Sequence, residues 1–156
     1  MIKRSLIILV LAWIGLALPV AAADKDPNLV LIKARQGEMD IRSMFATPLF
    51  MMAKGKVAYD AEKAESYAKN LQALMKVDTG MAWAPGTGTD KYPETSHALP
   101  DVWSTYPAIS EKGKKYAEAV NALAGAAGNG LDDLRSKVGD LGQGCKDCHD
   151  EFRQKE

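Results

Sequence analysis

The chain has 156 residues, of which 47% are hydrophobic, and it carries 20 basic and 20 acidic side chains. Without Lys3 and Arg4, which fall in the N-terminal leader described next, 18 basic side chains face 20 acidic ones, a net charge of −2. This balance argues against a partner that is bound through its negative charge, such as nucleic acid or an anionic membrane surface.

The N-terminus has the features of a secretory signal peptide. Residues 1–4 are short and basic, residues 6–18 form an uninterrupted apolar run, and Pro19 and three alanines at 21–23 follow. Such a run is shorter than a typical membrane span and precedes a small-residue cleavage site. We therefore expect residues 1–23 to be cleaved and the protein to be exported to the periplasm, with an uncleaved signal anchor as the alternative. Residues 24–156 are enough for one domain.

The first helix of that domain is predicted over residues 27–54. Asp26 can cap it, Pro27 suits its first turn, and Gly55 follows its end. Pro48 lies inside it, where a kink is expected. Projection at about 100° per residue gives one side an unusual mixture for a plain core stripe: Ile32, Arg35, Met39, Arg42, Ala46 and Phe50.

The next segments predict two more helices separated by a long loop. Asp60 can cap a second helix with an apolar face at helical spacing, and residues 78–80 end it. From 78 to 100 the helical periodicity disappears and Gly, Thr and Pro dominate, which predicts a long loop. This loop could have a function, with Trp83 covering an edge of a bound group, or Trp83 could simply pack across a helix end. A third helix is expected to start near Asp101 or, after Pro107, near Ser110.

The fourth helix, from residue 131 to near the C-terminus, carries the stretch on which the functional interpretation depends. Its apolar positions follow a heptad pattern: Leu131, Leu134, Val138, Leu141, Cys145, Cys148 and Phe152. The sequence Cys145-Lys146-Asp147-Cys148-His149 has the spacing of a c-type haem attachment site, with two thioether bonds and an axial imidazole from one helical face.

Two other interpretations of the cysteines are weaker. A disulfide in an exported protein is common, but here it would close a loop of only two residues. A thioredoxin-like redox pair would need an alternating strand–helix pattern, and we identify no strand. The sequence therefore predicts an all-α, single-domain, antiparallel four-helix bundle. One covalent haem c would lie between its helices. Gly142 and Gly144 would let the macrocycle approach the backbone.

The pattern as a whole resembles the cytochrome c′ family, the class II cytochromes c, in which the haem motif lies on the last of four helices. The resemblance spans nearly the whole mature chain and rests on matching pieces in the same order: Arg35-Gln36 with Met39, Lys54-Gly55, and residues 59–61, 85–87, 100–104 and 145–153.

The resemblance implies roles for individual residues. His149 would ligate the iron, Arg153 would lie beside it, and Arg35 would pair with a haem propionate. Members with methionine four positions after the first-helix arginine are six-coordinate and low-spin, and Met39 stands there. Family members are often homodimers through their first two helices, which this sequence leaves open.

Several residues keep ordinary alternatives. Met39 could instead fill the core, and Met44, Met51 and Met52 are competing thioethers, although only Met39 shares a face with the arginines. Arg42 is a second candidate for a propionate. His97, in the loop, has no spaced partner for a metal site.

The basic cluster Lys112, Lys114 and Lys115 could steer a redox partner or could simply be a solvated face. Arg35 and Arg153 could likewise be ordinary surface charges.

The leading hypothesis is an exported one-electron carrier with His149 and Met39 on the iron, acting with redox partner proteins rather than as an enzyme. The first alternative is a five-coordinate cytochrome c′ that binds a diatomic gas, nitric oxide or carbon monoxide. The second is a haem-free helical interaction protein.

Overall fold

The computed structural model describes residues 26–155, so the predicted signal peptide lies outside the described residues. In chain order the helices are α1 (Pro27–Ala53), α2 (Ala61–Leu74), the 3-10 helix η1 (Gly80–Trp83), α3 (Asp101–Ser104), α4 (Ala108–Ala124) and α5 (Leu131–Phe152). The strand-like pairing in this part of the chain is one isolated bridge between Ala98 and Arg153. The all-α prediction is confirmed.

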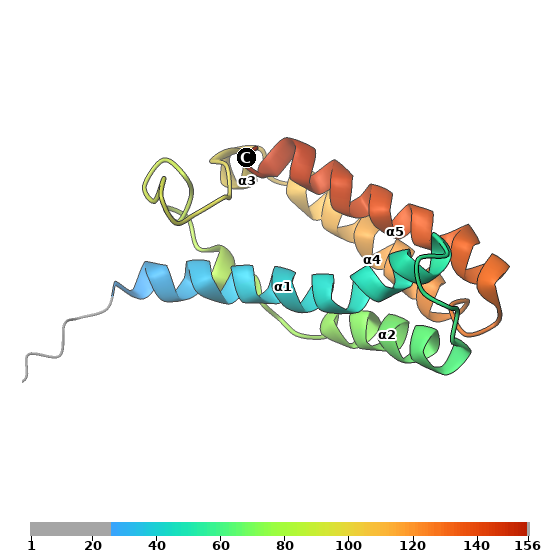
Figure 1. Ribbon diagram of the computed structural model, residues 1–156. Coiled ribbons are helices and arrows are strands. Elements are labelled where there is room, and N and C mark those ends of the chain that lie inside the picture. The colour runs from blue at the N-terminus through green and yellow to red at the C-terminus, as the bar shows by residue number, and fades with distance from the viewer. Residues whose placement is uncertain (1–25, 156) are drawn as a thin grey trace, which may run out of the picture.

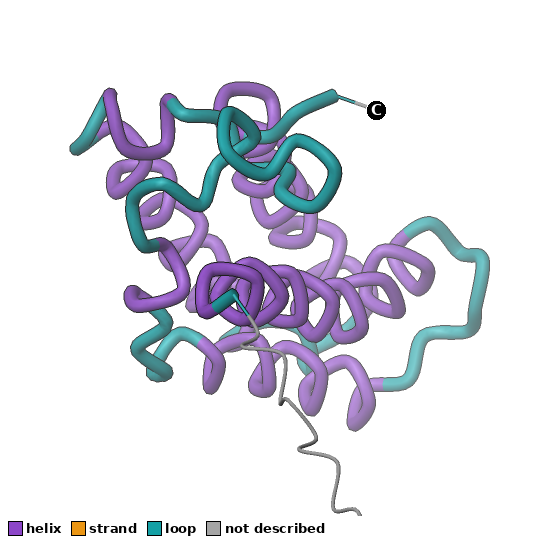
Figure 2. The backbone as a smooth tube through the Cα atoms, turned by 90° about the vertical axis from the view of Figure 1, so that its left-hand side faces the viewer, coloured by secondary structure: helices purple, strands orange, loops and turns teal. Residues whose placement is uncertain are grey.

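The four long helices form the bundle that the sequence predicts. Helices α1, α2, α4 and α5 alternate in direction, with α1 against α2 and α4 against α5, and the pairs meet through α2–α4 and α1–α5 contacts (Figure 1). The α1 and α5 ribbons are close where α5 begins and diverge toward its C-terminal end. The long loop and α3 occupy that end of the molecule, as Figure 2 also shows.

Local chemistry explains where the first two helices begin. The Asp26 side chain accepts a hydrogen bond from the Asn28 amide at 2.9 Å, and Asp60 accepts one from the Lys63 amide at 3.1 Å. Helix α1 is continuous through Pro48. Both predicted starts of the third helix are used, because α3 begins at Asp101 and α4 begins directly after Pro107.

The core lies between the four long helices and includes the heptad positions of α5. Leu134 and Leu141 are fully buried, and Val138 is nearly so. A second, smaller apolar cluster of Ala98, Val102 and Phe152 joins α3, the loop and the end of α5. Within residues 26–155, every helix is too short or too polar to cross a bilayer.

Candidate haem site

The C-terminal half of α5 presents the predicted attachment motif to a cavity inside the bundle. Cys145, Cys148 and His149 line a cavity of about 270 Å³ between α1, α4 and α5. Met39 of α1 and Tyr116 of α4 also line it. One helical turn therefore supplies both thiols and the imidazole, as their spacing predicts.

A second cavity, of about 590 Å³, adjoins the first and extends toward the long loop. The two cavities share Met39, Ser43, Cys148 and His149 as lining residues. These volumes lie near the range of roughly 300–1,000 Å³ found for small-molecule and cofactor sites. The second cavity is lined by residues of α1 and of the C-terminal half of α5, and by His97 and Ala98 of the long loop.

The donor chemistry at these cavities fits a covalently attached haem. Both cysteines are free, and burial raises the pKa of the Cys145 and Cys148 thiols, so they stay neutral. Burial, followed by the charge of Arg153, lowers the pKa of His149, which favours the neutral imidazole that binds iron. Residues 26–155 contain no cluster of three or more His, Cys, Asp or Glu able to hold a metal ion. A single imidazole would be enough to hold an iron that is otherwise bound by the nitrogens of a macrocycle.

The two arginines of α1 have different surroundings. Arg42 lines the first cavity, forms an ion pair with Glu38, and lies 4.9 Å from the centre of the Tyr116 ring. Its Nε and the Glu38 Oε2 are buried, with no hydrogen-bond partner among the described residues. Arg35 lines the second cavity, but the residue is only 4% exposed and its guanidinium bonds to the loop. The propionate role of Arg35 stays a prediction.

The remaining predicted residues lie at the second cavity. Arg153 and His97 both line it, and both are exposed side chains. Arg153 is also joined to the loop through its backbone bridge to Ala98. The structure therefore brings Met39, Arg35, Arg153 and the α5 motif to one continuous site.

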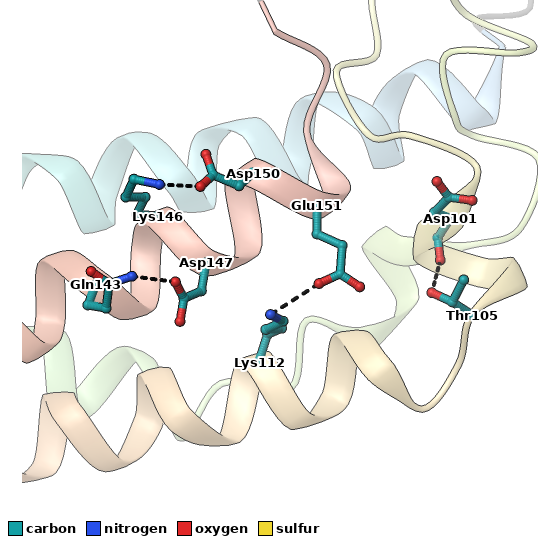
Figure 3. Close-up of polar contacts among 8 residues, drawn as sticks. All are labelled: Asp101, Thr105, Lys112, Gln143, Lys146, Asp147, Asp150 and Glu151. Carbon is teal, nitrogen blue, oxygen red and sulfur yellow. Dashed lines mark hydrogen bonds and ion pairs between the residues drawn. The ribbon is translucent and has the colours of Figure 1, made fainter.

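Helix α4 supplies two cavity residues to which the sequence assigned no role at the haem site. Tyr116 forms part of the cavity wall, with 7% of its surface exposed. Lys112, one turn earlier, also lines the first cavity and pairs with Glu151 of α5 at 3.1 Å (Figure 3). Lys112 and Tyr116 are four residues apart, and this spacing could have assigned them to one face of the helix. Lys114 and Lys115 are exposed, as a solvated face requires.

Gly144 lies where helix packing, as well as the predicted approach of the macrocycle, leaves no room for a side chain. It lines the first cavity, as its predicted closeness to the macrocycle requires. A Cβ built on it would also lie 3.3 Å from the Tyr116 Cα, so α4 and α5 pack backbone to backbone here. At Gly142 the nearest atom to a built Cβ belongs to the Phe50 ring, also at 3.3 Å.

A four-helix bundle with this motif on its last helix defines a c-type cytochrome of the bundle class. The family model described as Cytochrome C′ matches residues 30–153, and the chain belongs to that family. It is 40% identical to a cytochrome c′ of Cereibacter sphaeroides over 145 residues, covering 93% of this chain and 96% of that one. Proteins of this family carry a covalently bound haem c, which argues against the haem-free alternative.

Two solved structures share the fold. A cytochrome c′ from Rhodobacter sphaeroides superposes with a TM-score of 0.82 at 37% identity, covering 84% of this chain and all of that one. A nitric oxide complex of a single-residue variant of cytochrome c′ from Alcaligenes xylosoxidans has a TM-score of 0.71 at 28% identity, covering 83% of this chain and 97% of that one.

Proposed function

We propose that this cytochrome is a one-electron carrier whose haem iron is ligated by His149 on one side and Met39 on the other. The observation that carries the proposal is that both residues line both cavities and come from different helices, α1 and α5. Bound haem supplies the redox chemistry, since its iron changes oxidation state by one electron.

The chain's own residues would then hold and tune the group. Cys145 and Cys148 would anchor it, and the neutral His149 imidazole would ligate it. A thioether as the second ligand raises the reduction potential and favours the low-spin state, so little rearrangement accompanies electron transfer. The surrounding wall is mostly carbon, including Ala46, Phe50 and Tyr116, and would keep water from the iron.

Visible spectroscopy of the purified protein with and without carbon monoxide tests the ligation. The proposal expects a low-spin ferrous spectrum that changes little with carbon monoxide. Met39→Ala should convert it to a high-spin spectrum that binds carbon monoxide readily. Met81→Ala is the matched control, since Met81 is 78% exposed and outside both cavities. A high-spin wild type, or identical behaviour of the Met39 and Met81 variants, would remove Met39 from the iron.

The second candidate is a five-coordinate cytochrome c′ that binds nitric oxide or carbon monoxide. It is favoured by the nitric oxide complex of the related structure. Fast and tight nitric oxide binding to untreated wild-type protein would support it over the electron carrier. Neither candidate assigns a catalytic residue.

We also propose that the protein forms a homodimer through the outer face of α1. Val30, Ile41, Met44 and Met51 follow helical spacing there and are 38–59% exposed. Helix stripes of this kind usually pack against another helix. Sedimentation velocity should show a dimer for wild type and a monomer for Met44→Glu. A monomeric wild type at micromolar concentration would contradict the dimer.

The place of action follows from the predicted leader. We propose that residues 1–23 direct export and that the mature protein meets its redox partner proteins in the periplasm. Sequencing of the mature N-terminus from a periplasmic fraction should begin at residue 24. A chain that keeps Met1 in the membrane fraction would favour the uncleaved signal anchor instead.

A further inference from the structure

The long loop over the second cavity needs an explanation for its fixed course. Residues 84–100 contain no long helix and bury few apolar side chains. Ordering such a segment costs backbone entropy at every residue. Contacts with the bundle must therefore hold it in place.

Arg35 supplies the densest set of those contacts. Its Nη1 donates to Thr87 Oγ1 at 2.6 Å and to the Ala82 carbonyl at 3.3 Å. Its Nη2 donates to the Thr87 carbonyl at 2.5 Å and to Ser96 Oγ at 2.7 Å. One guanidinium thus joins both ends of the loop to α1. Thr87 and Ser96 are themselves almost completely buried.

Two tryptophans complete the surroundings of this guanidinium. Its central carbon lies 5.5 Å from the Trp83 ring centre and 5.9 Å from that of Trp103, within the range of cation–π attraction. The Trp103 indole N–H donates to the Trp83 carbonyl at 2.7 Å and so ties α3 to η1. Burial lowers the pKa of Arg35, and these contacts compensate the buried charge.

The far edge of the loop is attached to the end of α5. The Leu99 amide donates to the Phe152 carbonyl at 2.9 Å, and the Gln154 amide donates to the His97 carbonyl at 2.8 Å. His97 and Ala98 of the loop, together with Trp83 of η1, line the second cavity. Met39 and His149 line the same cavity. The loop is therefore one wall of the candidate haem site.

We infer that Arg35 is a positioning residue that fastens the loop over the haem site, and that this is its function rather than pairing with a propionate. An arginine side chain has five N–H donors; three bonds from Arg35 already go to the loop and a fourth goes to Ala82 of η1. The planar guanidinium donates to acceptors on three separate residues, Ala82, Thr87 and Ser96, and a lysine ammonium cannot reproduce this geometry. This role of Arg35 is the same whether Met39 or a diatomic gas is the second ligand of the iron.

Hydrogen exchange of the haem-bound protein tests the inference with Arg35→Lys, Arg35→Gln and, as the charge control on the same helix, Lys33→Gln. The amides of Thr89 and Ser96, which bond within the loop, should exchange at least about tenfold faster in both Arg35 variants. Amides of α5 should keep their protection, and Lys33→Gln should match wild type.

A second readout separates the two roles of Arg35. If it paired with a propionate, Arg35→Lys would largely restore wild-type behaviour, the loop would stay protected, and the pH dependence of the reduction potential would change in Arg35→Gln. That combination would overturn the inference. Should the Arg35 variants fail to fold, Thr87→Val and Ser96→Ala remove acceptors while keeping the arginine, and they should open the same amides. Unchanged exchange in both would equally overturn it.

Discussion

Substitution of Gly144 by alanine tests the close approach of α4 and α5 that places the haem-binding cysteines. In a helix interior, glycine to alanine normally stabilises by about 0.5–1 kcal/mol. At Gly144 the new Cβ would lie 3.3 Å from the Tyr116 Cα and 3.6 Å from its Cβ. Helix α4 cannot move aside as a side chain can, and overpacking of this kind costs about 1–3 kcal/mol. We expect a net loss of roughly 0.5–2 kcal/mol.

Gly139 provides the matched control on the same helix. A Cβ there meets nothing within 4 Å, so Gly139→Ala should gain the full helix-propensity term of about 0.5–1 kcal/mol. Gly142→Ala should fall between the two, because the atom that it meets belongs to the movable Phe50 ring. Urea unfolding of the haem-bound variants measures the differences. If Gly144→Ala stabilised as much as Gly139→Ala, the backbone contact with Tyr116 would be wrong.

Two further predictions concern stability. Leu141→Ala, at a fully buried position, should lower the free energy of unfolding by about 2–5 kcal/mol, whereas Val77→Ala, at a position 59% exposed, should stay within about 0.5 kcal/mol in the same urea titration. Equal effects would refute the core assignment. The hydrogen bond from the Lys63 amide holds the pKa of Asp60 below its ordinary value of 3.8, so its stabilisation is present above that pH and is lost as pH falls through the lower folded-state pKa. Asp60→Ala should therefore destabilise the protein at pH 7, by an amount that shrinks in unfolding measurements below pH 3.8; a pH-independent difference would exclude this capping role.

The parts of the fold that sequence predicts are those set by local chemistry. The caps Asp26 and Asp60 act through amides two and three residues away, so residue type and position were enough. The heptad of α5 likewise predicts burial of Leu134 and Leu141, because helical periodicity alone assigns them to one face. The same helical geometry, applied within one turn, also predicts that Cys145, Cys148 and His149 share a face.

The parts that sequence left open depend on contacts between distant segments. Arg35 binds Thr87 and Ser96, which are 52 and 61 residues away, and nothing in the local pattern of α1 selects them. The same holds for Tyr116, whose place on the cavity wall depends on how α4 lies against α5. Gly144 was predicted to make room for the macrocycle, but its contact with the neighbouring helix required knowledge of the helix pairing.

We expect this bundle to carry one haem bound covalently through Cys145 and Cys148. Intact mass spectrometry of the mature protein, purified from cells that attach haem to c-type cytochromes, tests it most directly. The expected mass is that of the polypeptide plus one haem, and the haem should be retained after denaturation and solvent extraction and lost when both cysteines are replaced by alanine. A mature protein with the bare polypeptide mass would contradict it.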